Sequence, residues 1–266
     1  MFTPAEVANN VIGIGKAKAG NKPYKLFLLG ILAGMFIALA AVGANTASCT
    51  IANASVGKLV GACIFPVGLL MVLVAGSELF TGNNLIIVSV LTGDVKWTAM
   101  LKNWGVVYLG NFVGSILIAL IACYSGQFGL FGGALAATTI KVATGKATLT
   151  FGQAILKGIA CNFLVCIAVW MSFAAKSVGG KLAAVYLPIM LFVLAGFEHS
   201  VANMYYIPAG LFAASATGTA VEGLTWGNFF INNLIPVTIG NIIGGAVLVG
   251  VMYWAIYLAD AKKEES

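Results

Sequence analysis

Two polar stretches interrupt long apolar runs of the chain: GSELFTGN at residues 76–83 and GFEHSVAN at residues 196–203. A glycine, a glutamate and an asparagine hold the same places in both stretches, at a constant offset of 120 residues. Irregular backbone inside lipid is tolerated only where it is buried in protein or lines a cavity. The two stretches therefore predict a membrane protein in which two corresponding helices are broken.

The repetition extends beyond the breaks. Three further pairs recur in the same order at similar offsets: Gly110-Asn111-x-x-Gly114 with Gly240-Asn241-x-x-Gly244, Gly30-Ile31 with Gly158-Ile159, and Phe65-Pro66 with Leu187-Pro188. The halves cover about 23–125 and 150–258, and each holds three apolar spans, so the second half must insert upside down. Broken helices in an inverted repeat indicate a transport site near the membrane midplane. The paired glycines are typical of positions where helices pack closely.

Composition supports the same fold class. Hydrophobic residues make up 61% of 266 positions, charged residues 8%, and the mean hydropathy is +1.01, which excludes a water-soluble domain. Six apolar segments each reach the ~20 residues that a spanning helix needs: 26–47, 60–92, 104–124, 153–175, 182–214 and 228–258. We predict an all-α membrane protein whose channel domain covers 23–258, with six transmembrane helices, the second and fifth broken.

The ends of the chain differ from the spans. Thr3, Pro4 and Glu6 form the pattern of a helix start, with a capping box and proline in the first turn. We expect an amphipathic helix within 1–22, lying on the membrane surface or against the bundle. A charged cytoplasmic tail is expected over 259–266.

The lysines set the expected orientation. Ten lie on the side of both termini, namely Lys16, Lys18, Lys22, Lys25, Lys96, Lys102, Lys176, Lys181, Lys262 and Lys263, and four on the other side, namely Lys58, Lys141, Lys146 and Lys157. Positive residues concentrate on the cytoplasmic side of membrane proteins. The asymmetry predicts that both termini are cytoplasmic.

Several function classes are disfavoured. The net charge of +6 comes from lysine without any arginine, whereas a nucleic-acid-binding protein would cluster its basic residues and favour arginine. The five cysteines are widely spaced and form no CxxC pair, which indicates packing rather than a disulfide framework or metal site. No nucleophile elbow, zinc-protease helix or phosphate loop occurs, and the adjacent His199 and Ser200 are badly placed for proton transfer. We expect no enzyme activity and no cofactor.

The breaks carry the residues suited to chemistry. Glu78 and Glu198 are the only acidic residues deep in the spans; either could be a substrate or proton site. Their symmetric placement favours a structural role, in which each carboxyl accepts hydrogen bonds from backbone N–H groups freed by its own break. Asn83 and Asn203 lie in the same two breaks, and we expect them to have a structural role there as well. His199, the only histidine, sits inside the second break, where we expect it to line a pore.

These stretches resemble a known family. The residues from Gly76 to Asn83, and those from Leu187-Pro188 to Met204, are similar to the two signatures of the formate/nitrite transporter family. The segment from Asn162 to Trp170 resembles its fourth-helix motif, and the likeness covers nearly the whole chain. Within the family, the sequence most resembles the hydrosulfide channel of anaerobic bacteria that reduce sulfite. The resemblance implies an aquaporin-like bundle, a homopentamer with one pore per subunit, and the bacterial plasma membrane.

The resemblance also implies roles for single residues. These are His199 as central pore histidine, Thr81 as the hydroxyl facing it, Asn162 as pore-facing partner, Lys146 as vestibule lysine in the outer loop, Phe65 and Phe192 as the outer constriction, and Leu69 and Leu79 as the inner one. Each has a simpler alternative. The four apolar residues could be core packing, Thr81 a helix cap, Asn162 a remote interhelical contact, and Lys146 a solvated loop charge.

The expected function is a channel for small monovalent weak-acid anions. The sequence Thr81-Gly82-Asn83-Asn84 departs from formate-type members, so hydrosulfide is the expected main substrate, with formate and nitrite also permeant. The alternative is formate or nitrite as the main substrate. A remoter alternative is an aquaporin-type neutral-solute channel, against which stands the absence of Asn-Pro-Ala boxes at both breaks. In each anion reading, Lys146 attracts the anion and His199 stabilises or protonates it at an apolar ring.

Overall fold

The computed structural model describes residues 1–259, and every regular element in that range is helical. The first half holds α1 (Pro4–Gly20), α2 (Pro23–Ser48), α3 (Ala54–Ile64), α4 (Val67–Met71), the π-helix η1 (Val72–Gly76), the 3₁₀-helix η2 (Gly82–Leu85), α5 (Ile86–Leu91) and α6 (Trp97–Tyr124). The second half holds the 3₁₀-helix η3 (Gln127–Gly133), α7 (Ala134–Ala147), α8 (Phe151–Ala174), α9 (Val178–Leu194), α10 (Ser200–Thr217), α11 (Trp226–Asn228), the π-helix η4 (Phe229–Leu234), α12 (Ile235–Ile242), the π-helix η5 (Ile243–Val251) and α13 (Met252–Tyr257). Except for residue 259, the expected charged tail lies outside the described residues.

The predicted spans and breaks are confirmed. Five helical stretches are long and apolar enough to cross a membrane: Pro23–Ser48, Ala54–Gly76, Trp97–Tyr124, Phe151–Ala174 and Trp226–Tyr257. α9 and α10, separated by the second break at 195–199, form the remaining segment. The first break, at 77–81, separates η1 from η2. Gly76 and Gly196 carry positive φ angles of 83° and 71°, so each helix ends at a residue that tolerates this backbone.

Glycines bring the spans together in the same way in both halves. α2 packs on α6, where a Cβ on Gly110 would lie 2.6 Å from the carbonyl oxygen of Phe27. α8 packs on α12, where a Cβ on Gly158 would lie 2.8 Å from the carbonyl oxygen of Val237. Any side chain at these positions would separate the backbones, so the predicted close-packing role of the glycine pairs is confirmed.

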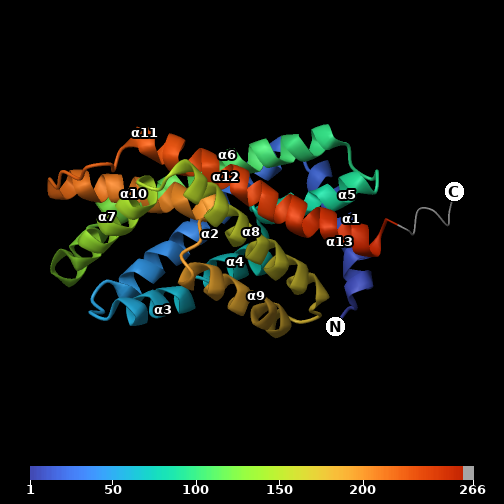
Figure 1. Ribbon diagram of the computed structural model, residues 1–266, viewed down its shortest axis with the longest axis horizontal. Helices are drawn as coiled ribbons and strands as arrows, with labels where there is room; N and C mark the ends of the chain where they lie inside the picture. The colour runs from blue at the N-terminus through green and yellow to red at the C-terminus, as the bar shows by residue number, and fades with distance from the viewer. Residues whose placement is uncertain (260–266) are drawn as a thin grey trace.

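The outer loop that was expected to hold Lys146, before the fourth span, is largely a helix, which corrects the sequence interpretation. η3 and α7 occupy residues 127–147, and α7 begins after Gly132 and Gly133, which turn the chain with φ angles of 64° and 89°. α7 has only 14 residues. Hydropathy therefore misses it, because a helix this short cannot cross a membrane. Figure 1 shows α7 and α1 at opposite ends of the long axis. Each precedes the first span of its own half.

α1 lies against the bundle. It begins with the predicted capping box, in which the Thr3 side chain accepts from the Glu6 backbone and the Glu6 carboxylate accepts from the Thr3 backbone N–H. Val7 and Val11 are buried, and Gly15 contacts the side chain of Ser89 on α5. Packing of this kind makes α1 one wall of the channel domain.

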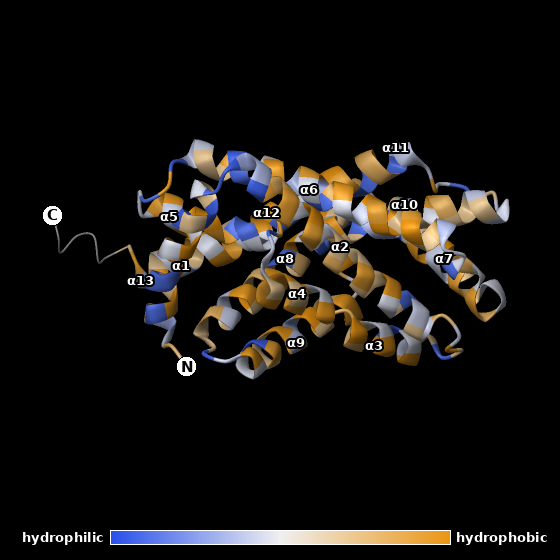
Figure 2. Cartoon of the chain, turned by 180° about the vertical axis from the view of Figure 1, so that it is seen from behind, coloured by the Kyte–Doolittle hydropathy of each residue, from blue (hydrophilic) through white to orange (hydrophobic). Residues whose placement is uncertain are grey.

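Polar and apolar residues are distributed as lipid requires. Hydrophobic residues occur along most of the helices in Figure 2, and large exposed ones include Leu28, Leu109 and Ile235. Half of the buried polar and charged residues in the described part of the chain are asparagines, among them Asn83 and Asn203. Polar groups removed from both water and lipid must pair with each other, and this interior pairing builds the site described next.

Candidate functional site

A hydrogen bond joins the two breaks at the middle of the molecule. Thr81 Oγ1 lies 2.8 Å from His199 Nε2, and the two side chains, 118 residues apart in sequence, are both buried. His199 Nδ1 accepts a hydrogen bond from the backbone N–H of Ala202 at 3.0 Å, which caps α10. Nδ1 therefore carries no proton, and Nε2–H donates to Thr81. The geometry selects a neutral imidazole, and the Thr81 hydroxyl proton remains free to donate.

Thr81 does not act as a helix cap. Its side chain makes no capping hydrogen bond to η2, the helix that restarts after the break. The capping alternative is therefore wrong. The residue that caps after a break is His199, at the start of α10.

Two cavities approach this pair from opposite ends. The first, here called the Lys146 cavity, has a volume of ≈ 590 Å³ and is lined by His199, Phe65 and Phe192 among others. The second, the Lys18 cavity, measures ≈ 360 Å³ and is lined by residues that include Leu69 and Leu79. His199 borders only the Lys146 cavity, and Gly82, next to Thr81, borders the other.

Apolar side chains stand on both sides of the histidine. The rings of Phe65 and Phe192 meet edge to face, with centroids 5.7 Å apart, and Phe192 stacks on the His199 ring at 5.9 Å. Leu69 and Leu79 are 2% and 3% exposed on the other side. All four belong to the hydrophobic core, so their packing and their placement at the cavity ends coexist.

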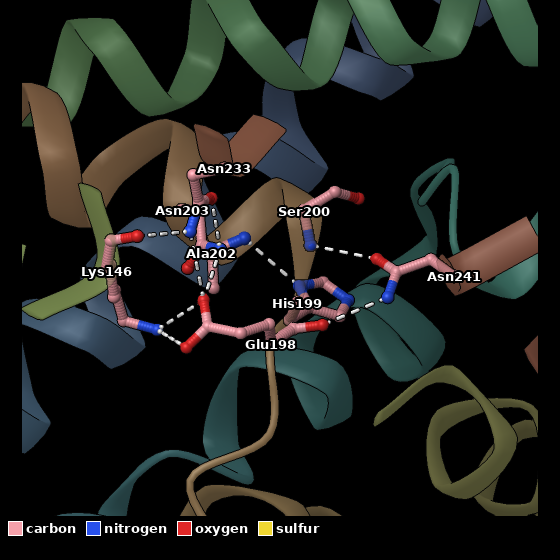
Figure 3. Close-up of polar contacts among 8 residues, drawn as sticks. All are labelled: Lys146, Glu198, His199, Ser200, Ala202, Asn203, Asn233 and Asn241. Atoms are coloured by element: carbon pink, nitrogen blue, oxygen red, sulfur yellow. Dashed lines mark hydrogen bonds and ion pairs between the residues drawn. The ribbon is translucent and has the colours of Figure 1, made fainter. Parts of the chain in front are cut away.

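A lysine, a glutamate and two asparagines hold the second break (Figure 3). Lys146 Nζ donates to both carboxylate oxygens of Glu198, at 3.0 and 3.1 Å. The same carboxylate accepts from Asn203 Nδ2 at 2.7 Å. Asn203 also donates to Asn233 Oδ1 at 2.7 Å, and Asn233 donates to the Lys146 carbonyl oxygen at 2.9 Å. The network ties α7, the break and η4 together.

The first break is held by the same combination of a lysine, a glutamate and two asparagines. Lys18 Nζ and Asn83 Nδ2 donate to Glu78 Oε2, at 2.9 and 2.6 Å. Asn83 also donates to Asn103 Oδ1 at 2.9 Å, and Asn103 donates to the Lys18 carbonyl oxygen at 3.1 Å. Lys18 on α1 is thus the counterpart of Lys146 on α7.

This corrects the expected partners of the two glutamates. Neither carboxylate accepts from backbone N–H groups of its own break; a lysine and asparagines neutralise and orient it instead. Glu78 and Glu198 are 6% and 4% exposed. A buried carboxylate without such partners would be strongly unfavourable.

The backbone freed by the second break is satisfied by Asn241 on α12. Its Oδ1 accepts from the Ser200 backbone N–H at 2.9 Å, and its Nδ2 donates to the carbonyl oxygens of Glu198 and Gly158, at 3.0 and 2.8 Å. One amide thus joins α12, the break and α8. Figure 3 shows Asn241 beside the histidine.

Asn111 on α6 does the same for the first break. Its Oδ1 accepts from the Phe80 backbone N–H at 2.9 Å, and its Nδ2 donates to the carbonyl oxygens of Glu78 and Gly30, at 2.9 and 2.8 Å. Sequence reasoning noticed the repeat around Asn111 and Asn241 but considered only its glycines. An asparagine inside an apolar helix at matching places in both halves was the available signal.

Asn162 is an interhelical contact that lies next to the histidine pair. Its Nδ2 is 3.2 Å from the Thr81 carbonyl oxygen, 3.0 Å from Asn84 Oδ1 and 2.7 Å from the Asn241 carbonyl oxygen. It is fully buried and borders neither cavity described above. The contact is therefore interhelical, as one alternative held, but it reaches the backbone of Thr81.

Lys146 lies in the last turn of α7 and not in a loop. Its side chain is 17% exposed and pairs with Glu198, which rules out a solvated loop charge. Its ammonium also sits 5.2 Å from the ring centroid of Tyr206. The sequence could not show this pairing, because 52 residues separate the lysine from its partner.

Spanning helices, a cavity at each of the two breaks and a buried polar pair that joins the breaks are the features of a membrane channel. Comparison with known proteins supports this. The family pattern described as Formate/nitrite transporter matches residues 5–255. The chain is 42% identical to the formate channel FocA of Escherichia coli strain K12, over 98% of this chain and 96% of FocA. It is 38% identical to a probable formate transporter of Methanothermobacter thermautotrophicus, over 97% of this chain and 98% of that protein.

Solved structures agree. A pentameric formate channel with formate bound superposes with a TM-score of 0.79 at 40% identity, covering 89% of this chain and 98% of that one. An FNT family ion channel superposes with a TM-score of 0.85 at 29% identity, covering 94% of this chain and 98% of that one. The chain belongs to the formate/nitrite transporter family. It is a multi-pass membrane channel and not an enzyme.

Proposed function

We propose that this channel conducts formate as its main substrate, with nitrite and hydrosulfide also permeant. Of the relatives reported above, one is named a formate channel and one a probable formate transporter, and one solved relative is a formate channel with formate bound. The preference for hydrosulfide expected from residues 81–84 finds no specific support in these comparisons. Formate, the alternative weighed from the sequence, is the better-supported substrate.

The observation that carries the proposal is the Thr81–His199 hydrogen bond between two apolar walls. In the proposed pore, Phe65 and Phe192 narrow the Lys146 side, and Leu69 and Leu79 narrow the Lys18 side. A full charge crossing such walls loses its water at a large cost in free energy. The buried hydroxyl and imidazole are the polar groups placed to compensate it.

The tautomer defines what His199 can do. Its Nε2–H can turn from Thr81 toward an anion, while Nδ1 stays bonded to the Ala202 N–H and keeps the ring oriented. Giving that proton away would leave an imidazolate in an apolar site, which is unfavourable. We therefore assign His199 the role of hydrogen-bond donor to the substrate. The proton that neutralises the substrate anion comes from water, and it enters the pore as part of the weak acid.

Size and charge then set selectivity. Formate, nitrite and hydrosulfide are small, monovalent and derived from weak acids, so one proton makes each neutral. Sulfate retains a charge after taking up one proton and should be excluded by the apolar walls. Asn162 supports the pore from behind, because it holds the Thr81 backbone in place.

We further propose a homopentamer with the Lys18 cavity facing the bacterial cytoplasm. A solved relative is a pentamer, and the many exposed large apolar side chains on the helices suit subunit contact. The lysine asymmetry places both termini inside. The N-terminus and α13 lie at the same end of the molecule in Figure 1, as this orientation requires.

Flux assays in proteoliposomes test the proposal. Formate, nitrite, hydrosulfide and sulfate are compared at equal concentration under an imposed pH gradient, with empty liposomes as control. We expect brisk formate flux, measurable nitrite and hydrosulfide flux, and no sulfate flux. Undetectable formate flux beside strong hydrosulfide flux would reverse the order of substrates. Light scattering in several mild detergents checks the pentamer, which a stable monomer or dimer would contradict.

A further inference from the structure

Tyr206 on α10 lies against the apolar wall formed by Phe65 and Phe192. Its ring stacks on the ring of Phe65, with centroids 6.4 Å apart and an interplanar angle of 15°. On another side, the ammonium of Lys146 lies 5.2 Å from the centroid of the Tyr206 ring. Tyr206 borders the Lys146 cavity and is 8% exposed. The ring is therefore held between the wall and the ion pair of Lys146 with Glu198.

Packing accounts for the ring of Tyr206 but not for its hydroxyl. Within residues 1–259, Tyr206 Oη has no hydrogen-bond partner, and it is not one of the wholly buried oxygen atoms without a partner. The hydroxyls of Tyr108 and Tyr186, by contrast, both make hydrogen bonds, at 2.8 and 2.9 Å. A buried tyrosine hydroxyl usually finds a partner. Of the two cavities described above, Tyr206 borders only the Lys146 cavity, so its hydroxyl is available to a molecule there.

The polar groups that contact this wall or Tyr206 are already paired. Lys146 Nζ donates to both carboxylate oxygens of Glu198. His199, whose ring stacks on Phe192, is bonded through Nε2 to Thr81. His199 must leave Thr81 before it can donate to a substrate. The Tyr206 hydroxyl can donate without breaking any hydrogen bond within the described residues, so it suits a substrate that is losing its water.

We propose that the Tyr206 hydroxyl donates a hydrogen bond to the substrate at the wall of Phe65 and Phe192, and that this bond makes the channel favour oxygen acids over hydrosulfide. The inference rests on the proposed function, because it names what sets the order of formate, nitrite and hydrosulfide. The bond forms while the substrate loses water at the wall. It therefore lowers the barrier to flux in both directions and involves no transfer of a proton.

The acceptor atom of the substrate decides how much the bond contributes. Formate, nitrite and their conjugate acids all present oxygen atoms, and a charged oxygen accepts from a hydroxyl most strongly. Hydrosulfide and hydrogen sulfide present only sulfur, which accepts hydrogen bonds weakly. The preference therefore has the same direction whether the anion or the neutral acid passes the wall.

The test removes one oxygen atom. Tyr206→Phe deletes the hydroxyl and keeps the ring, so the stacking on Phe65 and the contact with Lys146 remain. The matched control is Tyr205→Phe, which deletes the same atom from a neighbouring residue that borders neither cavity. Tyr206→Leu removes the ring as well and reports on packing. Each variant is compared with wild type for elution volume and melting temperature and is then reconstituted into liposomes at equal density.

The measured quantity is a ratio of fluxes in one preparation. Stopped-flow flux of formate, nitrite and hydrosulfide is recorded far below saturation. In Tyr206→Phe, formate and nitrite flux should fall about tenfold, which corresponds to about 1.4 kcal/mol. Hydrosulfide flux should fall less than about twofold, because sulfur accepts weakly. Tyr205→Phe should keep the wild-type ratio. Structural damage alone would lower all three fluxes together and leave the ratio of formate to hydrosulfide unchanged.

The outcomes separate this inference from the proposed function. A Tyr206→Phe channel with the wild-type flux ratio overturns the inference, and if Tyr206→Leu then loses flux, the ring alone matters. An equal change of the ratio in Tyr205→Phe also overturns it. If wild type carries no formate, the proposed function fails. The ratio of nitrite to hydrosulfide flux in the same variants then decides the inference.

Discussion

The two helix breaks, at 77–81 and 195–199, share one frame. In each, a lysine from the short helix that opens its half pairs with the glutamate, and two asparagines link the glutamate to that helix. Asn111 or Asn241 satisfies the opened backbone. In lipid, every buried charge and backbone group must find an internal partner, so both copies of a broken helix need the full frame.

The residues held by the frame differ. At matching positions, offset by 120 residues, the pairs are Ser77 and Phe197, Leu79 and His199, Phe80 and Ser200, and Thr81 and Val201. Only one of these eight residues is a histidine, and it bonds to the threonine of the other break. The supporting frame is therefore present twice, whereas the hydrogen-bonding pair suited to contact a substrate is present once, since one donor pair at the centre suffices for one pore.

Removing a glutamate of the frame should have the largest effect. Glu198→Leu leaves Lys146 buried without a partner, and loss of one member of a buried ion pair costs about 3–5 kcal/mol. Glu78→Leu should cost less, because Lys18 is more exposed, at 26% against 17%. Thermal unfolding and pentamer yield measure both.

Glu→Gln at the same positions provides the control. The amide oxygen still accepts hydrogen bonds, so much of the flux should remain. Normal folding of both Leu variants together with lost transport in both Gln variants would mean that the glutamates act in permeation and not in the frame.

The asparagine clamps should come next. Asn241→Val and Asn111→Val each leave a buried backbone N–H and carbonyl groups unpaired, at about 1–3 kcal/mol for such a group. We expect the melting temperature to fall by a similar amount in both variants, because the two asparagines make equivalent contacts. A large loss in only one variant would break the equivalence of the two frames. Asn9→Val, at an exposed position on α1, serves as control.

Exchanging the unique residues should change flux more than folding. His199→Phe removes the central donor, and one lost hydrogen bond of about 1.4 kcal/mol corresponds to a tenfold fall in rate. Flux should fall about that much throughout pH ~5 to ~8, because the loss concerns a hydrogen-bond donor, and the pH dependence set by the weak acid itself should persist. Stopped-flow flux across that range measures both.

Thr81→Val, which copies the residue of the other break, should lower flux in the same direction. A double variant that is no worse than His199→Phe alone would show that the pair acts as a unit. If His199→Phe abolishes the pH dependence of flux, the histidine takes part in proton transfer, which would contradict its assigned role as a hydrogen-bond donor.

The smallest effect is expected at the start of α1. The backbone and side chain of Thr3 donate to the Glu6 carboxylate, and these hydrogen bonds lower the pKa of Glu6. A lowered folded-state pKa stabilises the protein above the unfolded pKa, and this contribution is lost as pH falls through the folded one. Thr3→Ala should lower thermal stability slightly at neutral pH and less in acid. α7 has no side-chain cap, so no equivalent variant exists there.

Sequence reasoning determined the class of protein. Apolar run length, the repeated polar breaks and the lysine distribution are properties of local composition. Insertion into a membrane depends on the length and flanking charge of each segment, so local composition suffices to predict it. His199 and Thr81 could be selected because they interrupt lipid-facing runs at corresponding places. The residues around Asn162 and the two breaks sufficed to suggest the family, which the comparisons then showed.

Tertiary structure decided which groups pair. That Glu198 meets Lys146, that Glu78 meets Lys18, and that Asn111 and Asn241 close the breaks all depend on contacts between segments far apart in the chain. The tautomer of His199 follows from the backbone N–H of Ala202, which only the folded turn brings to Nδ1. The sequence alone does not distinguish a lysine that forms an ion pair from one that does not. Only packing shows that Lys146 is paired with Glu198 while Lys58, Lys141 and Lys157, which line the same cavity, make no ion pair within residues 1–259, because charge compensation depends on distance and not on composition.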